Sequence, residues 1–184
     1  GNDATSARFT ADVTTLEESS QYQYFATYPQ PSSVSGSTAY FSVPATQDGN
    51  YDGTCDVMTA VPVTGASITA SHTESQDVNL RMKHRMHLLK FYFEGTGMGE
   101  PVERIEATFP AAVCGTVAAD FTDCSSTPSA TGSTTLTLDL TTELVAGKYA
   151  YAVICPVALA SSQTISFTVY SATKRATFTR SGRT

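Results

Sequence analysis

Apolar and polar residues alternate along much of the chain with a period of two, as in β-strands that bury one face. The longest such segment, DVNLRMKHRMHLLKFYF, occupies residues 77–93. In its second half two sets of residues face opposite sides of an extended strand, Leu89, Phe91 and Phe93 on one and Leu88, Lys90 and Tyr92 on the other. A break near residues 83–85 divides the segment into two short strands or bends one long strand. Because every other apolar segment is shorter, we expect this one to be a central core strand.

The same alternation recurs in shorter segments that are separated by turns rich in Gly, Pro, Ser and Asn. The clearest lie at residues 21–28, 38–44, 102–109, 136–140, 148–156, 164–170 and 175–180. No segment has a convincing helical period, and no internal repeat is present. About ten to twelve short strands at hairpin-like spacing are typical of a β-sandwich, so the chain is predicted to be all-β.

Composition and charge narrow the class of protein. Only 15% of the 184 residues are charged and 41% are hydrophobic, which suits a β-protein displayed outside the cytoplasm. The net charge of −6 argues against a nucleic-acid partner, because such partners require a basic face. Basic residues do gather at 81–90 and 174–183, and we expect the first group to lie on a solvated edge. No apolar run approaches the ~20 residues of a membrane-spanning helix.

Four cysteines, Cys55, Cys114, Cys124 and Cys155, allow three disulfide pairings. No C-x-x-C spacing occurs and the histidines are distant in sequence, so a zinc site is not expected. Cys114 and Cys124 bracket a short turn-rich segment and could close a local bridge, as exported proteins oxidise their thiols. Cys155 could instead face the core as a small apolar residue.

One loop has the opening of a calcium-binding pattern. In DGNYDG, Asp48, Asn50 and Asp52 precede Gly53 as in an EF-hand loop, but the position of the bidentate Glu is Thr59. No helices flank the loop. An Asx-rich turn is therefore the favoured interpretation.

Other candidate motifs lack their structural context. His84 and His87 are three apart on a strand, as are Glu103 and Glu106, so each pair faces opposite sides. The S-x-x-K at residues 171–174 and the glycine run at 95–99 lack the helices that their catalytic and nucleotide-binding counterparts require. The sequence thus indicates no catalytic residue, no cofactor-binding residue and no metal ligand, and the chain is not expected to be an enzyme.

The order of several short motifs resembles the fimbrillin-like proteins of Bacteroidales, the major and minor subunits of type V fimbriae. The matching motifs, spread over residues 8–180, are Tyr28-Pro29, then Pro44 with Gln47, then Asp56, Met58 and Ala60, then His84 with Leu88 and Leu89, and finally the strand that ends at Pro156. Each motif is loose by itself, whereas their order and spacing together are fairly specific.

The resemblance implies a transthyretin-like Greek-key β-sandwich with a partial N-terminal domain at residues 1–75 and a C-terminal domain at 76–184. It places the junction near residues 71–76. Against the family pattern, the N-terminal domain is expected to be truncated and the last strand to be absent. An open sheet edge of that kind invites strand addition from another chain.

The resemblance also implies a function, that of a structural subunit or adhesin of a bacterial cell-surface fimbria. Such a protein is exported as an outer-membrane lipoprotein precursor. It assembles with other fimbrial subunits by β-strand complementation. Major subunit, anchor and tip adhesin all stay open. An alternative is a glycan-binding surface lipoprotein module, which predicts exposed aromatic rings beside Asp and Asn, drawn from Tyr22, Tyr24, Tyr51 and Tyr92. A hydrolase would need a nucleophile–base pair or perturbed carboxylates in a cleft, and the sequence offers neither.

Overall fold

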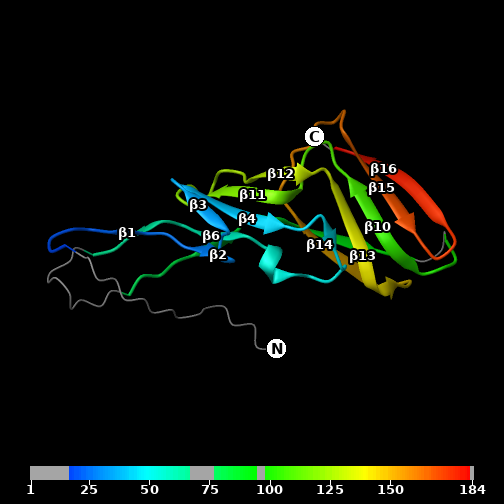
Figure 1. Ribbon diagram of the computed structural model, residues 1–184, viewed down its shortest axis with the longest axis horizontal. Coiled ribbons are helices and arrows are strands. Elements are labelled where there is room, and N and C mark those ends of the chain that lie inside the picture. Colours follow the sequence, from blue (N-terminus) through cyan, green and yellow to red (C-terminus); the bar gives the residue numbers. More distant parts are fainter. Residues whose placement is uncertain (1–16, 67–76, 95–97, 183–184) are drawn as a thin grey trace. The chain divides into compact units, whose positions relative to one another are not determined.

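The structure is a computed structural model that describes residues 17–66, 77–94 and 98–182 (Figure 1). These residues form β-strands and one short 3-10 helix, η1 (Gly53–Cys55), which confirms the predicted all-β class. No helix in the described part of the chain is long and apolar enough to span a membrane. The chain divides into two compact units, one of residues 1–24 and 63–79 and one of residues 25–62 and 80–184. The domain junction expected at residues 71–76 lies outside the described residues.

The described part of the smaller unit is a short antiparallel ladder. Strand β1 (Gln23–Tyr24) pairs with β7 (Val63–Thr64). The ladder continues by one hydrogen bond, from the Gly65 N–H to the Tyr22 carbonyl at 2.9 Å.

The largest sheet of the other unit has five strands. Their order is β16 (Arg175–Ser181), β15 (Thr164–Tyr170), β10 (Val102–Thr108), β13 (Thr135–Leu144) and β5 (Thr46–Gln47). All neighbours are antiparallel except β13 and β5, which run parallel. The register aligns Thr177, Thr168, Glu106 and Thr137 in one polar row across β16, β15, β10 and β13.

Three smaller sheets complete this unit. The four-stranded sheet has the order β12 (Ser129–Ser133), β11 (Cys114–Asp120), β4 (Thr38–Val43) and β3 (Ser33–Ser35). The three-stranded sheet has the order β2 (Thr27–Tyr28), β6 (Met58–Ala60) and β8 (Met82–His84). The two-stranded sheet pairs β14 (Tyr149–Ile154) with β9 (His87–Tyr92).

One apolar core joins the five-, four- and two-stranded sheets. In β4 and β13 its buried members alternate along the strand, as period-two patterning requires. The core includes Phe41 and Val43 of β4, Val117 of β11, Leu136 and Leu138 of β13, and Ala152 of β14. Antiparallel sheets that share one core are consistent with the predicted β-sandwich, while its Greek-key connectivity stays a prediction.

The expected central strand is instead an edge strand. The break near residues 83–85 separates β8 from β9, and the alternation in β9 is as predicted, with Leu89 and Phe91 partly buried and Leu88 and Tyr92 exposed. Within the described residues, however, β9 pairs only with β14. The central positions of the largest sheet are held instead by β10 and β13, whose Ala107, Leu136 and Leu138 are fully buried.

The local bridge considered for Cys114 and Cys124 does not form, because both are free thiols. Cys114 begins the seven-residue strand β11 and Cys124 lies beyond its far end, a separation of ~20 Å at ~3.3 Å per residue, which no disulfide spans. In the basic group at 81–90, Arg81, Lys83 and Lys90 are exposed as expected, whereas Arg85 is only 5% exposed. By contrast, Cys155 is fully buried in the core, as its alternative interpretation predicted.

Candidate functional site

The side chain of Gln47 occupies the place of a neighbouring strand beside β14. Its Nε2 donates to the Val153 carbonyl at 2.7 Å and to the Pro44 carbonyl at 3.2 Å, and its Oε1 accepts from the Val153 N–H at 2.9 Å. The buried amide therefore pairs with the N–H and the carbonyl of one residue of β14, Val153, as a neighbouring strand would. This arrangement gives a physical reason for the Pro44-to-Gln47 spacing noted in the sequence.

Two backbone hydrogen bonds close the rest of this edge of β14. The Tyr151 N–H donates to the Gly49 carbonyl at 2.8 Å, and the Cys155 N–H donates to the Val113 carbonyl at 2.8 Å. Together with Gln47, they satisfy the N–H groups of residues 151, 153 and 155, which alternate along the strand. No further strand can therefore pair with β14 on this side without displacing them.

The opposite edge of the same sheet is open. In the described part of the chain no strand pairs with β9 on the side away from β14. The Phe93 N–H donates to the Lys148 carbonyl, and the Phe93 carbonyl accepts from Gly147, so the main chain of residue 93 faces β14. Because hydrogen-bonding direction alternates along an antiparallel strand, the N–H and carbonyl groups of Leu88, Lys90 and Tyr92 face the open side.

An uncovered apolar strip lies next to this edge. The Phe91 ring of β9 packs edge-on against Phe167 of β15, with centroids 6.1 Å apart, so β9 lies across from β15. Phe167 stacks on Phe178 of the neighbouring strand β16, with centroids 5.1 Å apart and planes at 16°. Phe178 is nevertheless 42% exposed. A strand added to the open edge of β9 would lie across from β16 and cover this ring.

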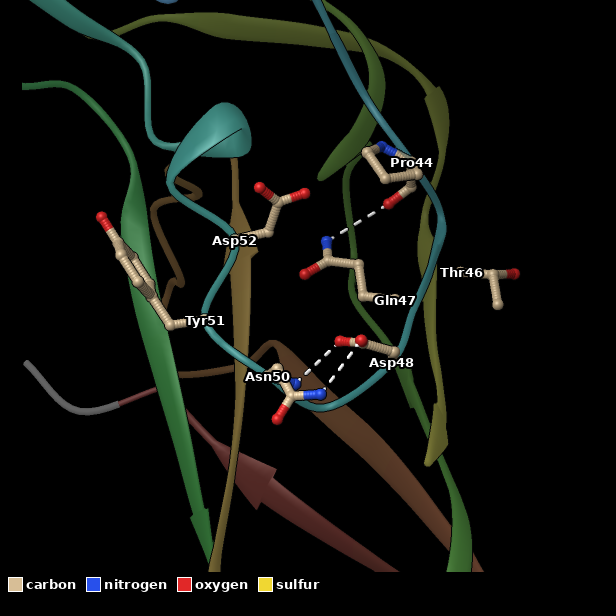
Figure 2. Close-up of a pocket in the computed structure, with 7 residues that line it drawn as sticks. All are labelled: Pro44, Thr46, Gln47, Asp48, Asn50, Tyr51 and Asp52. Atoms are coloured by element: carbon tan, nitrogen blue, oxygen red, sulfur yellow. Dashed lines mark hydrogen bonds between the residues drawn. The ribbon is translucent and has the colours of Figure 1, made fainter. Parts of the chain in front are cut away.

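The loop between β5 and η1 lines an open pocket of about 390 Å³ (Figure 2). Within it, Asp48 accepts hydrogen bonds from the backbone and side chain of Asn50, and Asp52 accepts from the backbone and side chain of Thr54. These bonds lower the pKa of both carboxyl groups. The Asx-turn interpretation of the loop is confirmed. Thr59, the position of the missing calcium ligand, is buried in β6 instead and accepts a hydrogen bond from Arg85.

Three of the sequence motifs meet in the three-stranded sheet. The register pairs Tyr28 of β2 with Met58 of β6, and Met58 with His84 of β8. Asp56, just before β6, accepts a hydrogen bond from the Tyr51 hydroxyl at 2.8 Å and lies 2.8 Å from the His84 Nδ1. Burial and this carboxylate raise the pKa of Tyr51 to about 12. Motifs that are up to 56 positions apart in sequence, from Tyr28 to His84, thus form one local structure.

The chain matches the model of the fimbrillin-like family over residues 2–183. It belongs to that family. No curated protein and no solved structure matches the chain. Fimbrillin-like proteins are structural pilins, so membership indicates a structural subunit of a cell-surface fimbria that assembles with other fimbrial subunits. The motif order described from the sequence is therefore that of a fimbrillin-like protein.

A carboxylate that the sequence did not single out fixes the turn between β15 and β16 in this fimbrillin-like chain. Glu100 accepts hydrogen bonds from the hydroxyls of Ser171 at 2.5 Å and Thr173 at 2.6 Å, while the Lys174 Nζ donates to the Met98 carbonyl at 2.7 Å. The two hydroxyls lower the pKa of Glu100 to about 2. The S-x-x-K segment is therefore a turn. The only sequence feature that pointed to Glu100 was the glycine run just before it, of which residues 95–97 lie outside the described part.

The four tyrosines of the glycan-binding alternative lie on different elements and in both units. Tyr51 is exposed beside Asp52 and Asp56. Tyr92 lies on β9, where its ring meets Tyr149 at a centroid distance of 5.0 Å. Tyr22 and Tyr24 belong to the smaller unit. His84 and His87 lie on different strands, and no group of three His, Cys, Asp or Glu side chains among the described residues is arranged to hold a metal ion.

Proposed function

We propose that this fimbrillin-like chain is a structural subunit of a bacterial fimbria that accepts an extended segment of a neighbouring subunit along the open edge of β9. The observation that carries the proposal is the backbone of Leu88, Lys90 and Tyr92, which no described strand pairs, beside the half-exposed ring of Phe178. Backbone hydrogen bonds would supply affinity, and alternate side chains would set the register.

The energetics of such an addition favour a segment with apolar residues at alternate positions. The six-residue strand β9 turns one of its two faces toward the core. Leu89 and Phe91 on that face are only partly buried. An incoming apolar side chain beside them would bury itself and Phe178 together, at ~25 cal/mol for each Å² of apolar surface removed from water. A polar side chain at the same position would lose its hydration without a partner.

The finer properties of the subunit follow from the family. We propose that the chain is exported as an outer-membrane lipoprotein precursor, and that its partners are other copies or related fimbrial subunits. An adhesin role is compatible with the same fold. Membership in a family of structural pilins supports a non-enzymatic role, and the proposal includes no cofactor.

A proline at the open edge tests the mechanism. Leu88→Pro removes an N–H that faces the open side, and proline is tolerated at edge positions whose N–H does not pair within the sheet. We expect this variant to fold, as judged by circular dichroism and thermal melting, and to lose SDS-resistant ladders and filaments in the fimbria-producing cell.

The matched control is Thr179→Pro on β16. The Gly182 N–H faces β15, because it donates to the Gln163 carbonyl. By alternation the Thr179 N–H faces away from β15, at the β16 edge of the five-stranded sheet. This variant should assemble normally. Ladders that persist in a folded Leu88→Pro variant, or that vanish equally in both variants, would contradict strand addition at β9.

A further inference from the structure

The outer face of the β9–β14 sheet exposes a cluster of tyrosines around one lysine. The register places Tyr149 opposite Tyr92, and Tyr151 opposite Lys90. Tyr92 is 54% exposed and Tyr149 is 48% exposed. Exposed aromatic patches on a protein surface commonly mark a binding surface.

Lys90 lies over these rings without a carboxylate. Its Nζ is 3.6 Å from the centroid of Tyr149 and 6.0 Å from that of Tyr151. Among the described residues, the ion pairs involve His84, Arg104 and Lys174, and none involves Lys90. A ring quadrupole stabilises a cation only partly, so an ammonium held on tyrosine faces stays available to an anion. What distinguishes Lys90 from the other cations of the described residues that make no ion pair is its place over two tyrosine rings.

We propose that this face binds a saccharide that carries carboxylate groups, such as a chain of uronic acid residues. The C–H faces of a pyranose ring pack against the exposed tyrosine rings, the tyrosine hydroxyls exchange hydrogen bonds with sugar hydroxyls, and Lys90 pairs with the carboxylate. The chemistry combines an apolar platform with a few placed polar groups, as small-molecule sites do.

Other occupants fit less well. An apolar protein surface would desolvate the Lys90 ammonium without supplying a counter-charge, which is unfavourable. An anionic membrane surface attracts clusters of several basic residues, whereas this face offers a single cation on an acidic chain.

The inference goes beyond the proposed assembly and does not rest on it. Strand addition would use the backbone edge of β9, whereas the side chains of Lys90 and Tyr92 stand on its outer face. A subunit with its edge filled would still present these rings to solvent. Failure of one proposal therefore leaves the other standing, and the two experiments measure different quantities.

Isothermal titration of the full chain with oligogalacturonate tests the inference, with maltohexaose as the neutral sugar and polyglutamate as the anion without a sugar. We expect binding to oligogalacturonate alone, weakened by added salt. Lys90→Gln and Tyr92→Ala should each lower the affinity by about tenfold, as expected for removal of one cation or one aromatic contact. Lys90→Arg should restore most of it.

Lys83→Gln on β8 removes the same charge from an exposed lysine outside the cluster and should leave the affinity unchanged. The inference is overturned by an absence of binding to oligogalacturonate. Equal binding of polyglutamate or of maltohexaose also overturns it, because the first would show charge recognition alone and the second would leave Lys90 without a role. Equal loss in Lys83→Gln and Lys90→Gln would likewise refute the assigned site.

Discussion

Replacing Gln47 by Ala should destabilise the large unit more than an ordinary polar-to-alanine change does. Gln47 is 8% exposed, and its amide makes three hydrogen bonds to main-chain groups of Val153 and Pro44. The substitution removes all three and leaves the N–H and carbonyl of Val153 without their partner. A buried main-chain group left unpaired costs ~1–3 kcal/mol, so we expect a loss of ~2–4 kcal/mol in the free energy of unfolding.

A loss of this size is readily measured against the ~5–15 kcal/mol that holds a typical domain folded. Urea titration followed by circular dichroism should show a lower midpoint. Hydrogen exchange should show that the Val153 amide loses protection while amides in the centre of β11 keep theirs. The pairing of these two readouts separates a local loss from general unfolding.

Gln163 provides the matched control, because its Oε1 also accepts a main-chain N–H, that of Ala160 at 2.9 Å, but in an exposed turn. Gln163→Ala should change the stability by less than ~0.5 kcal/mol. Gln47→Glu adds a pH test. Burial raises the pKa of the new carboxyl in the folded state, so the variant should be least destabilised below the unfolded pKa of ~4.3 and should lose stability as the pH rises. If Gln47→Ala costs no more than Gln163→Ala, the side chain does not replace a strand.

Glu100→Gln should weaken the β15–β16 turn at neutral pH. Because hydrogen bonds lower the pKa of Glu100 to about 2, the stability gap between the native chain and the variant should be full above pH ~4.5 and shrink toward pH 2 in an acid titration. Arg85→Lys should lower the unfolding free energy by ~2–4 kcal/mol in urea titrations, because one ammonium cannot reach both Thr59 and the carbonyl of Ser126 as the buried guanidinium does. Burial raises the pKa of the Cys55, Cys114 and Cys155 thiols to about 11. At pH 8 a disulfide reagent should therefore modify only Cys124 rapidly until the chain unfolds. Equally fast modification of all four thiols in the folded chain would contradict this packing.

Local pattern was enough to predict the strand class and the facing of side chains. Leu89 and Phe91 turned inward and Lys90 and Tyr92 outward as the alternation required, because period two is a property of the backbone itself. The neighbour order of strands was not predictable in this way. The length of an apolar run indicates how much surface a segment can bury, whereas the place of a strand in the sheet depends on which other strands pair with it, as for β10 and β13.

The candidate site shows the same limit more sharply. The Pro44-to-Gln47 spacing is visible in the sequence, but the partner of Gln47 lies 106 positions away. Arg85 looked like one of several surface cations, and only the fold reveals the acceptors that surround it. Contacts of this kind depend on which loops pack beside a side chain in the folded protein. The local alternation of apolar and polar residues does not predict which loops these are.

The closed side of β14 has a consequence for the number of neighbours that this sheet can take. A two-stranded sheet with both edges free could grow in two directions and would risk open-ended, sheet-like aggregation. Here Gln47, Gly49 and Val113 block one direction, and only the β9 side remains free within the described residues. This sheet is therefore monovalent, and subunits that join through it would form an unbranched chain with a defined polarity.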